Sequence, residues 1–271
     1  MPQRVFETLI FWTLLLITGI ALFLSVPDSA VLTQYAGPLI LYASLTAFAL
    51  IFSAALVQGE LSAAHAIGIL AALSLPSLAH GAVTWAIALG GLIGAALVVF
   101  TGDRRLPWQR PQERTVNAML LIVIRVTLSF FLTTGLYQAL GGALPIQLDN
   151  LEHILWVVGF CALYTAIYLT LFLLEMYGRD YGMRHILRVN LLEVLTVLGL
   201  PLPLSVLGAH IYANLSVLAF AICMLGLSLA IVAPYVISRA QQRLRKQVDE
   251  LRSLAIMSQA IRANYQYDSL M

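Results

Sequence analysis

Arg125 is the residue of this sequence that most needs a chemical explanation, because no other lysine or arginine falls inside a long apolar segment. A charged side chain at the centre of a membrane costs about 3 kcal/mol or more. A helical side chain leans toward the N-terminus of its helix, which favours Glu193 as the partner of Arg125, with Glu175 as second choice. Two interpretations remain open. Arg125 either lines a polar cavity, where it binds an anionic group or forms a switchable pair with Glu193, or belongs to a static pair that fixes the packing of the helices.

Three tyrosines are further candidates for contact with a ligand. Tyr164 and Tyr168 lie in one apolar segment, and Tyr137 lies at the outer end of the preceding segment. A phenol hydroxyl both donates and accepts hydrogen bonds, so a ligand that enters from outside could meet these groups. The alternative is that they make ordinary interface and helix contacts, in which tyrosine is common.

Catalytic and metal-binding patterns are missing from the sequence. Cys161 and Cys223 have no C-x-x-C partner, so we expect neither a disulfide nor a metal site. No H-E-x-x-H, no G-x-x-x-x-G-K and no recognisable Ser-His-Asp set occurs. We therefore expect no cofactor, no metal and no enzymatic activity in these residues. The histidines are scattered without i, i+4 spacing: His65, His80, His153, His185 and His210.

The composition is that of an integral membrane protein. Of 271 residues, 61% are hydrophobic and 10% are charged, and the mean hydropathy is +0.90. Soluble domains carry about 25% charged residues. The net charge of +2 is too small to suggest a nucleic-acid partner, and the lipid bilayer is the partner that the composition indicates.

The apolar segments predict a polytopic all-α bundle of about eight transmembrane helices. The first apolar run is longer than the core of a typical signal peptide, so it is predicted as a span. The polar stretch 101–114 would be a cytoplasmic linker between two four-helix membrane halves, 1–100 and 115–238, and residues 239–271 would form a cytoplasmic signalling helix. The expected spans are about 5–26, 34–57, 63–79, 82–100, 116–139, 153–175, 189–209 and 214–237.

Two of these spans have distinctive small residues or breaks. The span at 63–79 is short and is broken by Pro76, so it could be re-entrant rather than fully crossing. The span at 82–100 contains Gly90, Gly91 and Gly94, which predict a close approach of a neighbouring helix.

The distribution of basic residues predicts the orientation. The four loops near 27–33, 80–82, 140–152 and 209–214 contain no lysine or arginine. With eight spans, the arginines outside the spans and the whole basic tail fall on the opposite side. The positive-inside rule then places both termini in the cytoplasm, for a multi-pass protein of the cell inner membrane.

The last apolar segment passes directly into a polar helix. Leu244, Val248 and Leu251 recur there at steps of four and three, which is the spacing of a two-helix coiled-coil seam. We therefore expect a homodimer that forms through this C-terminal helix. The sequence leaves open whether membrane helices also take part.

Three prolines are candidate hinges. Pro201 and Pro203 interrupt the seventh expected span, and Pro234 lies near the end of the eighth. Each removes a backbone donor from the helix, so kinks at these places could pass motion to the seam. The alternative is that they only shape the helices.

The C-terminal residues resemble a known signalling linker. From Glu250 the chain reads Glu-Leu-Arg-Ser-Leu-Ala-Ile-Met-Ser-Gln-Ala-Ile, and then Tyr265-Gln266-Tyr267-Asp268-Ser269-Leu270-Met271. This is similar to the helix and short entry segment that lead into a GAF domain in bacterial sensor histidine kinases. The stretch 112–238 resembles multi-spanning sensor regions found in front of histidine kinase, GGDEF and HD-GYP modules. The resemblance implies a membrane input module that precedes a GAF-like domain, in a two-component or cyclic-dinucleotide system.

Three functions are compatible with these features. The first is a sensory input module that passes a signal through the last membrane helix into a dimeric coiled coil. The second is a small-solute transporter or permease component, which the proline breaks and the buried arginine would suit. The third, a membrane enzyme, lacks catalytic groups. The heptad helix favours the sensor, because a transporter does not need it, and the stimulus cannot be named from sequence.

Overall fold

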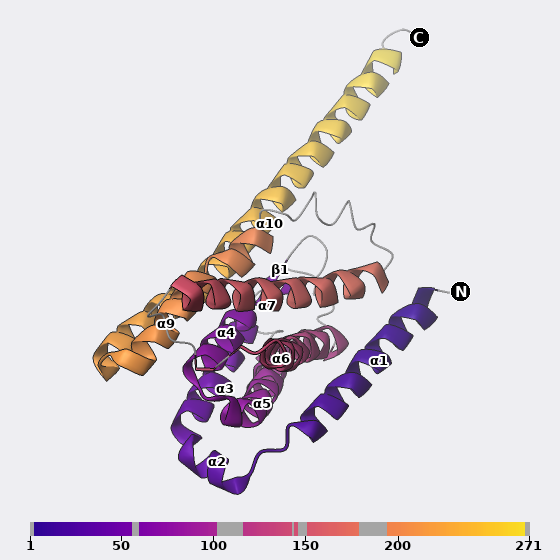
Figure 1. Ribbon diagram of the computed structural model, residues 1–271. Helices are drawn as coiled ribbons and strands as arrows, with labels where there is room; N and C mark the ends of the chain where they lie inside the picture. Colours follow the sequence, from indigo (N-terminus) through magenta and orange to yellow (C-terminus); the bar gives the residue numbers. More distant parts are fainter. Residues whose placement is uncertain are drawn as a thin grey trace.

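The computed structural model describes residues 3–55, 60–101, 116–142, 144–145, 151–178 and 194–268, which form a helical bundle from which one long helix projects (Figure 1). The predicted all-α fold is confirmed. The only strands in the described part are β1 (Ala54–Ala55) and β2 (Glu60–Leu61), which pair antiparallel with Ala54 opposite Leu61.

The remaining elements are helices that follow the apolar segments of the sequence. They are α1 (Gln3–Leu24), α2 (Ser29–Gln34), α3 (Ala36–Ile51), α4 (Ala64–Ser74), the short 3₁₀ helix η1 (Ser77–Ala79), α5 (His80–Thr101), α6 (Val116–Ala139), α7 (Leu151–Gly178), a short helix at 194–199, α9 (Leu202–Asn214) and α10 (Val217–Asp268).

Five segments in the described part are helical, long and apolar enough to cross a membrane. The other apolar helices, at 8–24, 36–51 and 64–74, are shorter. The predicted membrane class is therefore supported, whereas the predicted count of eight spans is not confirmed. The five candidates are Ser77–Phe100, Val116–Ala139, Glu152–Tyr177, Val194–Asn214 and Val217–Gln241.

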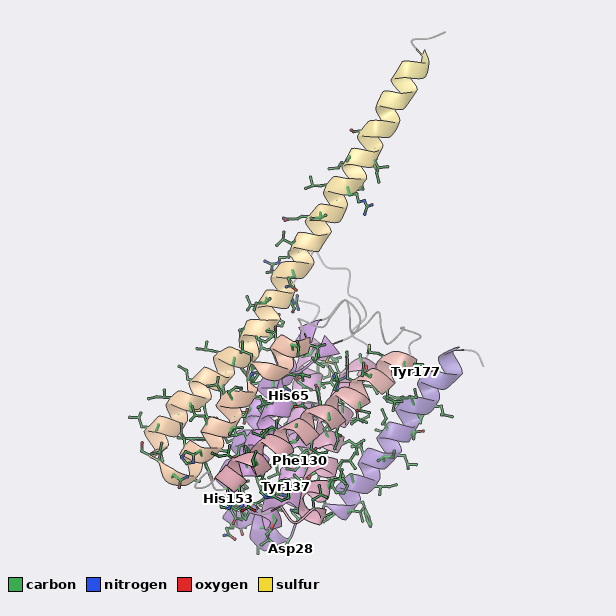
Figure 2. All side chains as sticks on the ribbon, turned by 45° about the horizontal axis from the view of Figure 1, so that its top comes forward. Asp28, His65, Phe130, Tyr137, His153 and Tyr177 are labelled. Carbon is green, nitrogen blue, oxygen red and sulfur yellow. The ribbon has the colours of Figure 1, made fainter. Side chains whose placement is uncertain are left out.

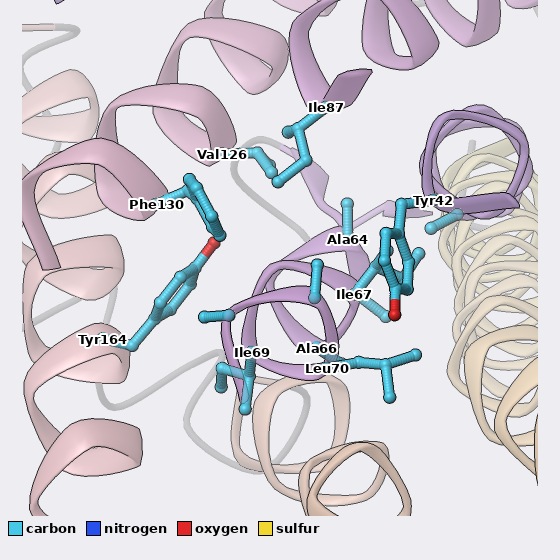
Figure 3. Packing of buried hydrophobic residues seen from close by; sticks show 14 of the residues in the cluster. Tyr42, Ala64, Ala66, Ile67, Ile69, Leu70, Ile87, Val126, Phe130 and Tyr164 are labelled. Atoms are coloured by element: carbon cyan, nitrogen blue, oxygen red, sulfur yellow. The ribbon is translucent and has the colours of Figure 1, made fainter. Parts of the chain in front are cut away.

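Helix α4 is the centre of the bundle. All of its 11 residues are buried, and it contacts α3, α5, α6, α7 and α9 (Figures 1 and 3). Its length is about 16 Å, roughly half the thickness of the hydrocarbon core of a bilayer. It ends at Ser74 because the residue before a proline avoids the helical region, and Leu75 before Pro76 is extended. The break expected at Pro76 is thus present.

The glycines of α5 allow a close approach of α3. A Cβ atom at Gly90 would collide with the carbonyl oxygen of Ala43, and one at Gly94 would lie 2.7 Å from the carbonyl oxygen of Ala47. Real Cβ atoms do not come so close to backbone oxygens, so the two helices can pack at this distance only with glycine at these positions. The close approach predicted from the sequence is confirmed at both.

Helix α1 packs on the outside of the bundle. It forms a separate apolar cluster in which Ile10 and Leu14 pack with Ile124 and Leu128 of α6. Its other face leaves large apolar side chains exposed, including Trp12 and Phe23. An exposed apolar face of this extent is typical of contact with lipid.

Helix α10 is one uninterrupted helix of 52 residues. Such a helix is about 78 Å long, far more than the roughly 30 Å of a hydrocarbon core. Pro234 lies inside it and the helix continues through this residue, so the hinge expected there remains a prediction. Beyond the candidate span Val217–Gln241, the rest of α10 leaves the bundle as a single helix (Figure 1).

The bundle has two distinguishable ends. In Figure 2, Asp28, Tyr137 and His153 lie at one end, and Tyr177 lies at the other, close to the beginning of α1. The part of α10 after Gln241, called its free part below, extends on the Tyr177 side. The end marked by Asp28 and His153 is the one whose loops contain no lysine or arginine.

Candidate functional site

The centre of the candidate site is a buried ion pair between two neighbouring helices. Arg125 Nη1 of α6 donates to Glu175 Oε2 of α7 over 2.9 Å, and the two side chains are only 2% and 8% exposed. Of the two partners that the sequence suggested, Glu175 is confirmed. Glu193 lies outside the described residues, so a second contact with it stays a prediction. A charge this deeply buried is stable only when it is paired.

Two aromatic rings complete the surroundings of the guanidinium group. The Arg125 Cζ atom lies 5.0 Å from the ring centroids of both Tyr168 and Phe172, on the same helix as Glu175. Residues 168, 172 and 175 are one turn apart and therefore share the face of α7 that meets α6. The negative faces of the two rings add to the attraction that the carboxylate supplies.

The backbone carbonyl of Ser62 connects this pair to the centre of the bundle. The Tyr168 hydroxyl donates to the Ser62 oxygen over 3.0 Å, and Nδ1 of His65 lies 3.4 Å from the same oxygen. The other ring nitrogen of His65 lies 3.0 Å from the carbonyl oxygen of Leu198, just before the break at Pro201. His65 is fully buried and stacks at 5.3 Å on Tyr168. Through these contacts, Tyr168 and His65 connect α7, the start of α4 and the short helix at 194–199.

His65 was not recognised from the sequence as part of the site. The spacing of the histidines in the sequence does not single it out, because its importance depends on α4 being surrounded by other helices. The available signal was the pair Ser62 and His65 at the start of an apolar helix, where polar side chains supply hydrogen bonds to the first turn. Ser62 Oγ indeed accepts from the amide of Ala64 over 3.2 Å.

The cluster lies next to the hairpin that contacts α10. Ser62 directly follows β2, and β1 packs against α10. On this side of α10, Ser238 is buried and the ring of Tyr235 meets Phe52 edge-on at 5.4 Å. The Arg239 Cζ atom lies over the Tyr235 ring, 5.0 Å from its centroid. The hairpin therefore stands between the ion pair and the place where α10 leaves the bundle.

Tyr137 and Tyr164 occupy the half of the α6–α7 contact that lies nearer to Asp28 and His153. Tyr137 packs edge-on against Trp156 and Phe160 at 5.6 and 5.1 Å, which fits its alternative interpretation as a helix contact. Tyr164 is fully buried, and its hydroxyl abuts Gly68 of α4. The three tyrosines thus lie along one helix contact, with Tyr168 alone at the ion pair.

The candidate hinges differ from one another. At Pro201 the chain leaves the short helix at 194–199 and begins α9, with Pro203 in its first turn. The expected interruption of this span is confirmed, whereas movement about it stays a prediction. Pro201 and Pro203 are well placed at a helix start, because the first amides of a helix need no partner within it.

The residues of the expected coiled-coil seam lie on the free part of α10. Leu244, Val248 and Leu251 are 61%, 57% and 67% exposed. Within the described part of the chain no segment covers them, so they are available to a partner there. The coiled coil and the dimer remain predictions.

The described residues contain no group of three or more histidine, cysteine, aspartate or glutamate side chains that could hold a metal ion. Cys161 and Cys223 are buried free thiols. What the site offers chemically is an ion pair in an apolar bundle, with hydroxyl, imidazole and carbonyl groups around it.

Comparison of the chain with protein-family models, with curated proteins and with solved structures finds no match.

Proposed function

We propose that this chain is the membrane-embedded input module of a signal-transduction protein, which associates as a homodimer through the free part of α10. The observation that carries the proposal is the continuity of α10, which is packed in the bundle at one end and exposes Leu244, Val248 and Leu251 at the other. A rigid helix that begins among the membrane helices would transmit their rearrangement to whatever its far end binds.

The contacts around Ser62 support this proposal, because they offer a physical connection between the bundle interior and α10. A change at Arg125 or Tyr168 would act on the Ser62 carbonyl, on the hairpin that follows it and then on α10 near Ser238. A stimulus can shift such a connection only if it binds two packings of the helices with different affinity.

The proposed orientation has both termini in the cytoplasm of a cell with an inner membrane. It is supported by the loops without basic residues at the end marked by Asp28 and His153, opposite to the end from which α10 extends. The proposed output is a GAF-like domain of a histidine kinase or cyclic-dinucleotide protein, on the resemblance of the residues from Glu250 onward. We assign no catalysis to the membrane residues.

The oligomeric state in detergent tests the proposal. Light scattering coupled to size exclusion would compare residues 1–271 with a chain that ends at Ser238. We expect a dimer for the first and a monomer for the second, because only the first has the seam. Monomers in both cases would contradict the proposal. Dimers in both would place the interface among the membrane helices instead.

A small-solute transporter is the second candidate, favoured by the buried Arg125–Glu175 pair and by the broken helix at Pro201. Interrupted helices and membrane-buried charges mark the binding sites of many transporters. A transporter reconstituted in liposomes would let a probe such as glycerol enter, and would do so equally well when the chain ends at Ser238. Impermeable liposomes together with a seam-dependent dimer would favour the sensor.

A further inference from the structure

The hydroxyl group of Tyr164 lacks a hydrogen-bonding partner among the described residues, although the side chain is fully buried. The chain makes room for this hydroxyl, because a Cβ atom at Gly68 of α4 would collide with it. In Figure 3 the hydroxyl end of the ring points toward Phe130 of α6. The hydroxyl therefore lies among α4, α6 and α7.

Two further hydroxyls of α6 share this property. Ser129 and Thr133 are fully buried, and neither hydroxyl has a hydrogen-bonding partner in the described part of the chain. Thr134 behaves differently, because its hydroxyl donates to the carbonyl oxygen of Phe130 in the preceding turn, over 2.8 Å. Ser129 and Thr133 follow Arg125 at steps of four residues, so they lie on the same face of α6, one and two turns farther on.

The contacts of α6 with α7 place these hydroxyls at the level of Tyr164. Arg125 meets Tyr168 and Phe172, whereas Tyr137, three turns later, meets Phe160. The two helices thus run antiparallel, and the turns of α6 between Arg125 and Tyr137 lie opposite the turns of α7 between residues 168 and 160. Ser129 and Thr133 are in these turns of α6, and Tyr164 is in the facing turns of α7.

Three buried hydroxyls without partners at one place are costly. Each such group costs about 1–3 kcal/mol, and nearly all buried polar groups in proteins have a partner. Phenylalanine, alanine and valine would fill nearly the same volume without this cost. A guest that forms hydrogen bonds with the three hydroxyls would remove this cost.

We propose that Tyr164, Ser129 and Thr133 form a binding site for a small uncharged molecule that both donates and accepts hydrogen bonds, either water or a small organic solute. The hydroxyls carry no charge, and the nearby charges of Arg125 and Glu175 are paired with each other. The site begins one helical turn along α6 from Arg125. Its role as the input site rests on the proposed function, whereas the binding itself does not.

The proposal is tested by whether the melting temperature falls or rises when these hydroxyls are removed. If the hydroxyls bind a guest, Tyr164→Phe and Thr133→Val each remove a hydrogen bond and should lower the melting temperature in detergent by about 2–6 °C. If the hydroxyls are unpaired, the same changes remove a buried polar group and should raise it. An unchanged or raised melting temperature in both variants would overturn the proposal.

Thr134→Val is the matched control for Thr133→Val, because its hydroxyl is satisfied within α6 and its effect should not depend on Tyr164. The double variant Thr133→Val/Tyr164→Phe should lose less than the sum of the single losses, since both hydroxyls would bind the same guest. Strictly additive losses would mean that the two hydroxyls do not share a ligand, and would overturn the shared site.

Native mass spectrometry then separates the two sources of the guest. An added mass on the wild-type chain that is absent from Tyr164→Phe identifies an organic solute. If the masses show no adduct, an experimental density map should show a water within hydrogen-bonding distance of the Tyr164 hydroxyl. A protein group in that place would overturn the proposal. These results do not depend on the oligomeric state. The proposed binding site and the proposed dimer can therefore be contradicted independently of each other.

Discussion

Helix α4 and the free part of α10 place their apolar side chains in opposite surroundings. Every residue of α4 is buried by neighbouring helices of the same chain, whereas Leu244, Val248 and Leu251 of α10 are more than half exposed. Apolar side chains gain stability only by being covered. The comparison separates two kinds of contact: the surroundings of α4 stabilise the bundle itself, whereas the exposed apolar side chains of α10 are where the proposed partner helix would pack.

The largest effect on the bundle is expected from breaking the ion pair beside α4. Glu175→Gln removes the carboxylate to which Arg125 Nη1 donates, which should lower the stability by about 3–5 kcal/mol. For a chain of this size, the melting temperature in detergent should fall by roughly 6–20 °C. The measurement is thermal unfolding followed by tryptophan fluorescence.

The double variant Arg125→Met/Glu175→Leu is the control for this prediction. It removes both charges at once and keeps similar volumes, so most of the lost stability should return. A melting temperature of Glu175→Gln equal to that of the wild type would show that the carboxylate does not stabilise the bundle.

A smaller effect on the bundle is expected at Gly68 of α4. Gly68→Ala would drive a methyl group into the ring and hydroxyl of Tyr164, and overpacking of this kind costs about 1–3 kcal/mol. Gly159→Ala on α7 is the matched control, because, apart from the neighbouring residues and backbone of α7 itself, no described atom lies within 4 Å of a Cβ atom at that position. The control should leave the melting temperature unchanged or raise it slightly, since alanine favours the helix. Equal losses in both variants would contradict the close packing of α4.

The smallest effect on the bundle is expected on the free part of α10. Leu251→Glu should change the stability of the bundle by no more than about 0.5 kcal/mol, because an exposed side chain loses few contacts. The same change should abolish the dimer, as measured by light scattering. Met257→Glu is the control, since Met257 is 62% exposed but lies about 120° around the helix from Leu251. A dimer that survives Leu251→Glu, or that Met257→Glu disrupts equally, would exclude the proposed seam.

Residue patterns were sufficient to predict a structural feature where its cause lies in the local sequence. The end of α4 before Pro76 and the close approach at Gly90 and Gly94 were predicted because proline and glycine act on the backbone that contains them. The spacing of Leu244, Val248 and Leu251 predicted a coiled-coil seam; α10 leaves these side chains exposed, and the coiled coil itself stays a prediction.

Patterns were insufficient where the cause lies between segments. The sequence favoured Glu193 over Glu175 as the partner of Arg125. Either glutamate could reach the arginine, depending on how the helices pack, and the sequence does not contain that packing. The observed pair with Glu175 depends on how α7 is placed against α6. His65 was missed for a related reason. One of its carbonyl neighbours, Ser62, is close in sequence, but the other, Leu198, is brought to it only by folding.

The sequence alone was enough to predict an all-helical, membrane-type protein, a buried charge in the fifth expected span (116–139, which is α6) and a last helix that continues beyond the apolar segments. These properties follow from hydropathy and periodicity, which each segment carries alone. The packing of the helices was needed to show that α4 is a short central helix, that Glu175 and Tyr168 contact Arg125, and that Ser62 joins this cluster to the hairpin beside α10. These are contacts between distant segments, and their energies depend on relative positions that a linear pattern does not contain.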